Sequence, residues 1–277
     1  MTTSNTPPRA FITGAASGLG RELALRYATA GYRICVADIH VERAAAVVAE
    51  CEALGVEAFF YSCDVSQDQD LANAAELVGQ RWGGIDVLIN NAGVAGGGPF
   101  DWLSMEDWHW MMNINFNGVL RGCRAFVPMM KRQGSGHIIN IASMAGLLNP
   151  PGMSNYNVAK AAVVSLSETL APELQPFGIS VTCVCPSFFK TNLGESLRTP
   201  DESTASTMNK LLDNSSELTA AEIAALIFQG MSAGTFLVIP HAKARQAWNA
   251  KCANLEQHLQ AQLALANQLK QRAKRKE

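Results

Sequence analysis

Tyr156 and Lys160 form a Tyr-x-x-x-Lys pair that could exchange a proton with a substrate oxygen. The two residues are one helical turn apart, so their side chains project from the same face of a helix that we predict over residues 154–177. A free tyrosine has a pKa of about 10, and an adjacent ammonium lowers it toward the range of a general base. Tyr156 would then take a proton from an alcohol or give one to a carbonyl. Because this spacing is also typical of a solvated helix face, the chemistry needs further residues.

Ser143 and Asn115 are two polar residues that could assist such a pair. Ser143 ends the apolar run 137–142, at the edge where open α/β sheets bind ligands, and its hydroxyl could hold a substrate oxygen. A serine in this position also serves as a turn or cap residue. Asn115 falls inside a helix predicted over 106–131, where asparagine is unfavourable. Its purely structural interpretation is a buried polar side chain satisfied by backbone.

Gly14, Gly18 and Gly20 lie between the apolar run 10–12 and a predicted helix over 18–30. Glycines there allow a tight turn in which backbone approaches a pyrophosphate at a helix N-terminus. The spacing is not the usual G-x-G-x-x-G, so the interpretation depends on context, and Asp38 at the end of the next apolar run supplies it. Its carboxylate could bind a ribose diol and would repel a 2′-phosphate, whereas Ser17 and Ile39 are not basic. We therefore predict NAD(H), with limited NADP(H) use left open by the nearby residues His40 and Arg43.

The elements that must position these residues alternate between strands and helices. Apolar runs predict strands at 10–12, 32–37, 56–63, 85–89, 137–142, 179–185 and 235–239. Helical patterns fall at about 18–30, 41–54, 67–82, 106–131, 154–177 and 219–231. This repetition predicts an α/β fold with about seven parallel strands, doubly wound, and helices on both faces.

The chain divides into a domain over residues 1–240 and a helical extension over 241–277 with a basic end. The polar segment 187–218 is long for a loop, and we interpret it as a lid. In the extension an apolar stripe recurs at spacings of three and four, and it must pack on its own domain or on a second subunit. The stripe consists of Trp248, Cys252, Leu255, Leu259, Leu263, Ala266 and Leu269.

Composition narrows the function classes. Of the 277 residues, 48% are hydrophobic and 17% charged, which allows a sizeable core, and the net charge of −2 gives no general attraction to nucleic acid or anionic membranes. Seven cysteines without a C-x-x-C pair indicate reduced thiols. No signal peptide or membrane-spanning stretch is evident, so we expect a cytoplasmic protein. The histidines lack ligand spacing, which argues against a metal site.

The motifs together resemble the short-chain dehydrogenase/reductase family over about residues 9–192. They are Thr13–Gly20, Asp64-Val65, Asn90-Asn91-Ala92-Gly93, Asn115, Ser143 and Tyr156 to Lys160. The resemblance implies a single Rossmann-like domain with a catalytic set of Asn115, Ser143, Tyr156 and Lys160. Lys160 would also hold the nicotinamide ribose, and Asn115 would support a water in a proton relay.

The resemblance also implies a set of cofactor contacts. Asp64 would contact the adenine amino group, Val65 would lie beside it, Asn91 would face the adenine ribose side, and Thr191 would hold the nicotinamide amide. The whole set is Gly14, Ser17, Gly18, Leu19, Gly20, Asp38, Asp64, Val65, Asn91, Ala92, Gly93, Tyr156, Lys160 and Thr191.

Two departures from the family pattern concern the cleft and the assembly. Ser187 follows Pro186 where the family usually has glycine, which could narrow the space beside the nicotinamide. No Asp-Gly-Gly segment follows Pro240, which puts the family's tetramer contacts in doubt. A homo-oligomer is still expected, as a dimer through the helices at 106–131 and 154–177 or as a tetramer.

We expect an NAD-linked oxidoreductase that interconverts a secondary alcohol and a ketone. Met144, Met153, Phe188 and Phe189 are candidate pocket residues, and their apolar character favours an apolar small-molecule substrate. One alternative is an NADP(H)-dependent carbonyl or acyl-thioester reductase. The other is a non-catalytic nucleotide-binding scaffold whose basic tail binds an acidic partner.

Overall fold

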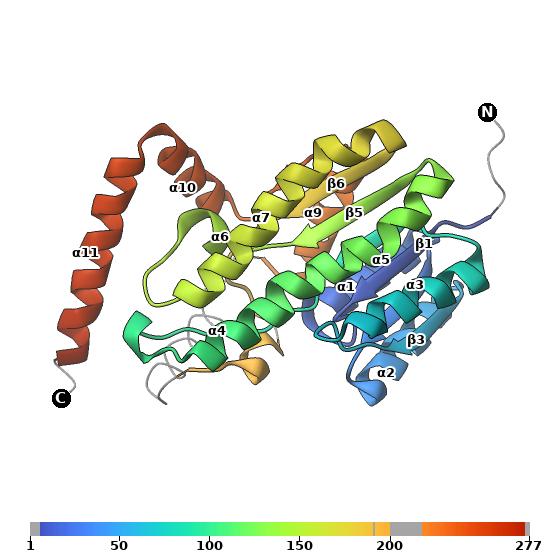
Figure 1. Cartoon of the computed structure of the whole chain (residues 1–277), viewed down its shortest axis with the longest axis horizontal. Coiled ribbons are helices and arrows are strands. Elements are labelled where there is room, and N and C mark those ends of the chain that lie inside the picture. Colours follow the sequence, from blue (N-terminus) through green and yellow to red (C-terminus); the bar gives the residue numbers. More distant parts are fainter. Residues whose placement is uncertain (1–5, 191, 200–217, 275–277) are drawn as a thin grey trace.

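Seven strands form one parallel sheet in the order β3-β2-β1-β4-β5-β6-β7 (Figure 1). The computed structural model describes residues 6–190, 192–199 and 218–274. Each strand is a nearly continuous apolar run, as expected for a sheet that is covered on both faces. The strands are β1 (Arg9–Thr13), β2 (Arg33–Asp38), β3 (Ala58–Ser62), β4 (Val87–Asn90), β5 (Gly136–Ile141), β6 (Ile179–Val184) and β7 (Leu237–Val238). The predicted α/β fold with seven parallel strands is confirmed.

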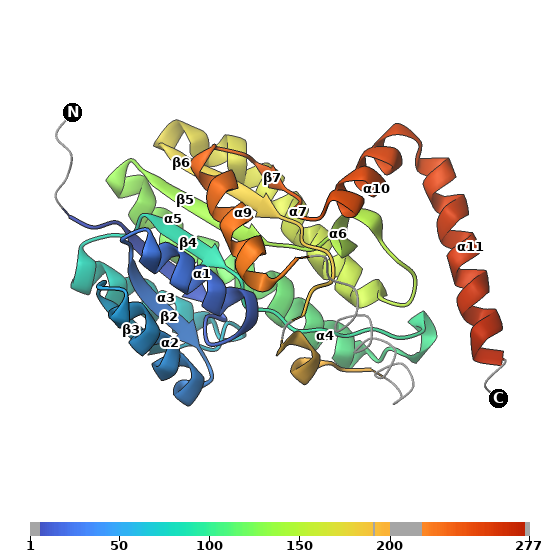
Figure 2. The same cartoon turned by 180° about the vertical axis from the view of Figure 1, so that it is seen from behind.

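Helices cover both faces of the sheet. α1 (Gly18–Thr29), α2 (Val41–Ala53) and α9 (Ala220–Ser232) pack on one face through a shared apolar cluster, and Figure 2 shows α1 and α9 in front of the sheet. α3 (Asp68–Trp82), α5 (Gly118–Gln133) and α7 (Ser154–Leu174) cover the other face (Figure 1). Two apolar cores therefore hold the sheet rigid between them.

The order of the strands creates a crevice at the carboxyl edge. From β1 the chain passes to β2 and β3 on one side, and then returns to place β4 on the other side of β1. The connections after β1 and β4 therefore diverge, and in open α/β sheets ligands bind at such a point. The residues that follow β1, β2, β4 and β5 all emerge at this edge.

The helix predicted over 106–131 is divided in the structure. It consists of α4 (Met105–Met112), a π-helical turn η2 (Asn113–Asn117) and α5. A capping box between Ser104 and Asp107 begins α4. The apolar period of a helix does not show a local change of hydrogen-bond register, so the sequence could not place the π turn, which contains Asn115.

Four short elements complete the described part of the domain. They are the 3₁₀ turn η1 (Phe100–Trp102), the helical turn α6 (Ala145–Leu148), the 3₁₀ turn η3 (Gln175–Phe177) at the end of α7, and the 3₁₀ segment η4 (Asn192–Ser196). The segment η4 lies within the predicted lid, whereas lid residues 200–217 lie outside the described part of the chain.

The C-terminal extension forms two helices, α10 (Ala242–Ala253) and α11 (Leu255–Lys274), separated by Asn254 in an extended conformation. Trp248 of α10 packs against the core, whereas α11 stands away from the sheet in both views (Figures 1 and 2). Leu255, Leu259 and Leu263 of the predicted stripe are about half exposed. The chain's own domain therefore does not cover them, and packing on a second subunit stays a prediction.

All seven cysteines are free thiols, of which six are buried and Cys252 on α10 is exposed. Among the described helices, none combines the length and apolar character needed to cross a bilayer. Within the described ranges, no three His, Cys, Asp or Glu side chains gather in a way that could hold a metal ion.

Candidate active site

The turn after β1 packs so closely that only glycine fits at two positions. Gly14 has a φ of +63°, and a Cβ added to it would lie 2.8 Å from Ala92 Cα. A Cβ added to Gly20 would lie 2.0 Å from the Gly14 carbonyl oxygen. The first turn of α1 therefore rests directly on the turn backbone.

The N-terminus of α1 faces this turn without a side-chain cap. Ser17 is the N-cap residue, yet its hydroxyl accepts no capping hydrogen bond, and the first turn carries no acidic residue. Helix N-terminal N–H groups attract anions through their unpaired donors and the helix dipole. This close, uncapped turn fits a dinucleotide pyrophosphate, as the glycine spacing predicts.

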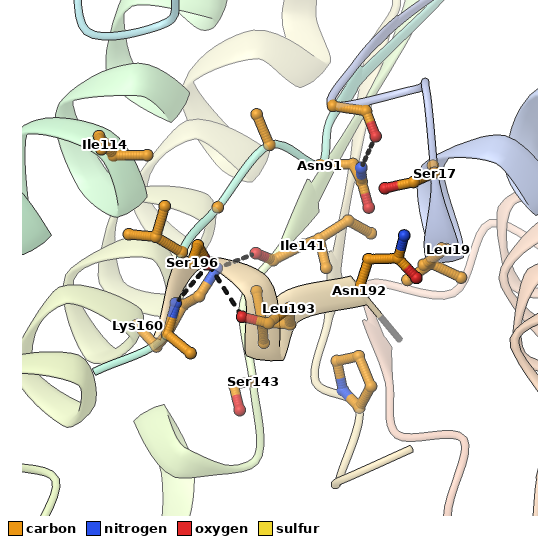
Figure 3. A pocket seen from close by; sticks show the side chains of 18 of the residues that line it. Ser17, Leu19, Asn91, Ile114, Ile141, Ser143, Lys160, Asn192, Leu193 and Ser196 are labelled. Atoms are coloured by element: carbon orange, nitrogen blue, oxygen red, sulfur yellow. Dashed lines mark hydrogen bonds between the residues drawn. The ribbon is translucent and has the colours of Figure 1, made fainter. Parts of the chain in front are cut away.

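Thr13 and Asn91 brace the ends of β1 and β4 against each other. The Thr13 hydroxyl oxygen accepts from the backbone N–H groups of Asn91 at 3.0 Å and Ala92 at 3.1 Å. The Asn91 amide, labelled in Figure 3, in turn donates to the carbonyls of Thr13 at 2.9 Å and Gly14 at 3.1 Å. Asn91 thus fixes the glycine turn, and its predicted contact with the adenine ribose side stays a prediction.

Asp38 ends β2 with its carboxylate held in place by backbone. Oδ2 accepts from Ala16 N at 2.9 Å, and Oδ1 accepts from His40 N at 3.0 Å. Each carboxylate oxygen can accept more than one hydrogen bond, so Asp38 can also accept from a ribose diol. After β3, Asp64 is fixed similarly, because its Oδ1 accepts from Ser66 N at 2.9 Å.

The predicted proton-transfer pair lies beyond β5, on the first turns of α7. Lys160 is almost completely buried, and its ammonium donates to the Ile141 carbonyl at 2.9 Å (Figure 3). Burial lowers the pKa of Lys160 to about 8. Burial raises the pKa of Tyr156, while hydrogen bonding to Ser143 lowers it. Ser143 is oriented by its neighbour Ala145, whose N–H donates to the serine Oγ at 3.1 Å.

Asn115 lies at the centre of the π turn and is fully buried. Its Oδ1 accepts from Val94 N at 2.8 Å, and its Nδ2 donates to the Val94 carbonyl at 2.9 Å. A Cβ added to Gly93 would lie 2.9 Å from Asn115 Oδ1 and 3.6 Å from Lys160 Nζ. The absence of a side chain at Gly93 therefore lets Asn115 and Lys160 approach the same small space.

One cavity of about 440 Å³ joins the glycine turn to the proton-transfer pair. Figure 3 shows Ser17 and Leu19 on one side of this cavity and Lys160 on the other. Of the predicted site residues, Asn115 does not line it, and Thr191 lies outside the described residues. All the others line the cavity: Gly14, Ser17, Gly18, Leu19, Gly20, Asp38, Asp64, Val65, Asn91, Ala92, Gly93, Ser143, Met144, Met153, Tyr156, Lys160, Phe188 and Phe189. The structure thus places the predicted cofactor-binding and proton-transfer residues around one cavity, while the role of each residue stays a prediction.

Several lining residues were missed from the sequence. They are Ile114, Ile141, Pro150, Asn192, Glu195 and Ser196. Figure 3 shows Asn192, Leu193 and Ser196 of η4 crossing the view between Lys160 and Leu19. Ser196 Oγ accepts from Ala95 N at 3.3 Å, which ties η4 to the loop after β4. A short polar 3₁₀ segment has no apolar period, so only its place inside the predicted lid could have indicated it.

Comparisons with known proteins show which proteins this chain resembles. The family model described as "short chain dehydrogenase" matches residues 8–202. A 3-oxoacyl-acyl-carrier-protein reductase FabG of Thermotoga maritima is 36% identical over 187 residues, which cover 68% of this chain and 76% of the reductase. A C alpha-dehydrogenase of a Sphingobium species is 31% identical over 265 residues, covering 91% of this chain and 84% of the relative.

A solved structure resembles nearly the whole chain. It is a short-chain dehydrogenase/reductase from Burkholderia phymatum in complex with NAD, with 31% identity and a TM-score of 0.85. The similarity covers 92% of this chain and 96% of that one. It therefore extends past the end of the family match and into the C-terminal part of the chain.

Proposed function

Because this chain belongs to the short-chain dehydrogenase family, and is therefore an oxidoreductase acting on CH–OH or C=O groups, we propose that it interconverts a secondary alcohol and a ketone with NAD as cofactor. One observation carries the proposal. Tyr156, Lys160 and Ser143 meet at one end of a cavity whose other end is lined by Asp38 and the glycine turn.

In this proposal the side chains move and hold the proton while the bound nicotinamide supplies hydride exchange. Tyr156 Oη takes the proton of the alcohol during oxidation and returns it to the carbonyl oxygen during reduction. The Lys160 ammonium favours the phenolate form by its positive charge. Ser143 Oγ accepts from Ala145 N, and its O–H, which hydrogen-bonds with Tyr156 when no substrate is bound, would donate to the substrate oxygen instead.

Asn115 has an indirect part in this proposal. Its side chain is occupied by Val94 and by Met111 Sδ, to which Nδ2 donates at 2.7 Å. A π turn runs its hydrogen bonds i→i+5 in place of i→i+4, and such turns are frequent at functional sites. We assign to this turn the relay water that would return protons to Lys160.

The NAD preference rests on Asp38. Its carboxylate is fixed at the end of β2, where it would accept from the adenosine ribose and repel a 2′-phosphate. The B. phymatum protein in complex with NAD agrees with this choice, whereas a dehydrogenase from Sphingobium yanoikuyae in complex with NADPH, also similar over 92% of this chain, agrees with the NADP(H) alternative.

Reduction of a 3-oxoacyl thioester with NADPH is the second candidate, because FabG proteins are among the relatives at 36% identity. The FabG protein aligns with 68% of this chain, whereas the C alpha-dehydrogenase aligns with 91% of it. The longer alignment favours the first candidate. The cavity wall also favours an apolar alcohol or ketone, since Met144, Met153, Phe188 and Phe189 line it.

The proposal is tested by incubating the protein with NAD and a panel of apolar secondary alcohols while NADH absorbance is followed. We expect NADH formation with some members of the panel, and tighter binding of NADH than of NADPH. Binding of NADH without turnover of any alcohol, ketone or thioester would favour the scaffold alternative. Tighter binding of NADPH together with thioester reduction would favour the second candidate.

The organisation of the chain belongs to the same proposal. Residues 1–240 would form the dinucleotide-binding and catalytic domain, with 241–277 as a helical extension. We propose a homo-oligomer in the cytoplasm, whose size in solution can be measured by light scattering.

A further inference from the structure

An ion pair spans the cavity at the end where Asp38 lies. Arg43 Nη1 on the first turn of α2 donates to Glu195 Oε2 of η4 at 2.8 Å. Both residues line the cavity, although they are far apart in sequence. The pair therefore joins the segment after β2 to the segment that crosses the cavity from the other side.

The charges around Arg43 place it beside the site predicted for the adenosine ribose. The pKa of Arg43 is raised by its hydrogen bond to Glu195, by the charge of Glu195 and by the charge of Asp38. Lys160, another basic residue that lines the cavity, is at the opposite end and is bonded to Ile141. At the Asp38 end, Arg43 is thus the guanidinium that could meet a ligand.

A guanidinium is a strong receptor for phosphate because its N–H groups form a fork that matches phosphate oxygens. NADP differs from NAD by a 2′-phosphate on the ribose that Asp38 is predicted to bind. Arg43 and Asp38 would therefore act in opposite senses on that phosphate. Which effect prevails depends on what else holds Arg43.

We propose that Glu195 is a second determinant of cofactor specificity, which acts by holding Arg43 in an ion pair and so withholding its guanidinium from a 2′-phosphate. With Glu195 in place, two carboxylates and one guanidinium surround the ribose position. The proposal builds on the proposed cofactor site. It makes Glu195 a positioning residue on the segment that crosses the cavity.

A contribution to folding alone is a poor explanation for this pair. The side chains are 43% and 54% exposed. Exposed ion pairs add little to stability because water screens them and ordering two long side chains costs entropy. Loss of Glu195 should therefore leave the melting temperature unchanged within a degree or so and appear in ligand affinity.

The experiment measures the dissociation constants of NADH and NADPH by fluorescence titration for the wild type, Glu195→Gln, Arg43→Gln and the double variant. We expect Glu195→Gln to shift the ratio of affinities toward NADPH by about tenfold, as one freed charge-assisted hydrogen bond allows. In the Arg43→Gln background the same substitution should produce no shift. High salt should reduce the gain, because exposed charges are screened.

Glu50→Gln is the matched control, because Glu50 pairs with Arg21 in another exposed ion pair that does not line the cavity. It makes the same change in net charge and should leave the ratio of affinities unaltered. The proposal is overturned if Glu195→Gln leaves the ratio unchanged, if the gain persists without Arg43, or if Glu50→Gln produces it too.

Failure of the proposed cofactor choice is a different result. It would appear as tighter NADPH binding by the wild type, whereas the role of Glu195 is decided by the Arg43-dependent change in ratio.

Discussion

The Lys160 ammonium lies 5.9 Å from the centre of the Tyr156 ring, one helical turn away on α7. Both side chains are buried. Burial raises the pKa of Tyr156 and lowers the pKa of Lys160, so it favours the neutral form of each group. A buried ammonium near a phenol favours the phenolate, and a phenolate in turn favours the ammonium. We therefore expect a change at one residue to alter the pKa of the other.

Tyr156→Phe keeps the ring and removes the hydroxyl that we propose as acid and base. Turnover of alcohol or ketone should fall by at least about 10²-fold, while NADH affinity changes little. Steady-state kinetics and fluorescence titration measure the two effects. Tyr61→Phe is the control, because that hydroxyl donates to the Asp70 carbonyl outside the cavity. Full turnover by Tyr156→Phe would exclude the assigned role.

Lys160→Met removes a buried charge and should change how stability depends on pH. The Lys160 pKa is lowered from 10.5 to about 8 in the fold, so the folded protein binds fewer protons than the unfolded chain between these values. The free energy of unfolding of the wild type, relative to that of the variant, should therefore increase as the pH rises through this window. The increase is about 2 kcal/mol between about pH 7 and about pH 9.5.

Denaturant unfolding of the wild type and Lys160→Met at both pH values measures this difference in the free energy of unfolding. The comparison cancels the titration of groups that do not interact with Lys160. A difference that is the same at both pH values would mean that Lys160 is not desolvated. The variant should also lose activity, because Tyr156 loses its cationic neighbour.

Gly20→Ala should abolish dinucleotide binding and destabilise the fold, because the new Cβ would lie 2.0 Å from the Gly14 carbonyl oxygen. Gly79→Ala is the control, since its Cβ would meet only the flexible Met129 Cε, at 3.0 Å, and alanine favours a helix by about 1 kcal/mol. Thermal unfolding with and without NADH measures both effects. Normal NADH binding by Gly20→Ala would contradict the close packing of the turn.

The C-terminal helices support the wall of the cavity through two long-range hydrogen bonds. The Lys251 ammonium donates to the Leu147 carbonyl, and His258 Nε2 donates to the Leu148 carbonyl at 2.9 Å. These carbonyls end α6, between the lining residues Met144 and Met153.

The double variant Lys251→Met/His258→Leu should raise KM for the alcohol by up to about tenfold, with NADH affinity unchanged, because each lost bond is worth roughly 1 kcal/mol. Kinetics and titration measure these values, and the control is Gln260→Ala, an exposed change on α11, the helix that carries His258. An unaltered KM would show that the tail does not support the wall.

The sheet was predictable because each strand is a continuous apolar run, from residues 10–12 to residues 235–239. The two ends of the cavity, at the glycine turn and at the proton-transfer pair, were also predictable. The motifs that mark them are the glycine spacing, Asp38 and the Tyr156–Lys160 pair, and each depends on local geometry. The π turn at Asn115 was not, since it changes hydrogen bonding without changing the apolar period. The break at Asn254 was also missed, because the stripe continues across it.

Polar contacts between residues far apart in the chain could not be predicted from the sequence either. Ser187, at the position where the family usually has glycine, donates from its backbone N–H to His241 Nδ1 at 3.1 Å. His241 comes just after Pro240, where the family's Asp-Gly-Gly is missing. The two departures therefore meet in space, which no spacing rule could reveal.

The distribution of buried and exposed thiols should allow a spectroscopic label to be attached at one position. Six cysteines are enclosed by the two cores, and Cys252 is exposed on α10, beside the lysine that reaches the Leu147 carbonyl. A maleimide dye would therefore couple selectively at this position, with no engineered attachment point required. Its emission would report on movement of the C-terminal helices.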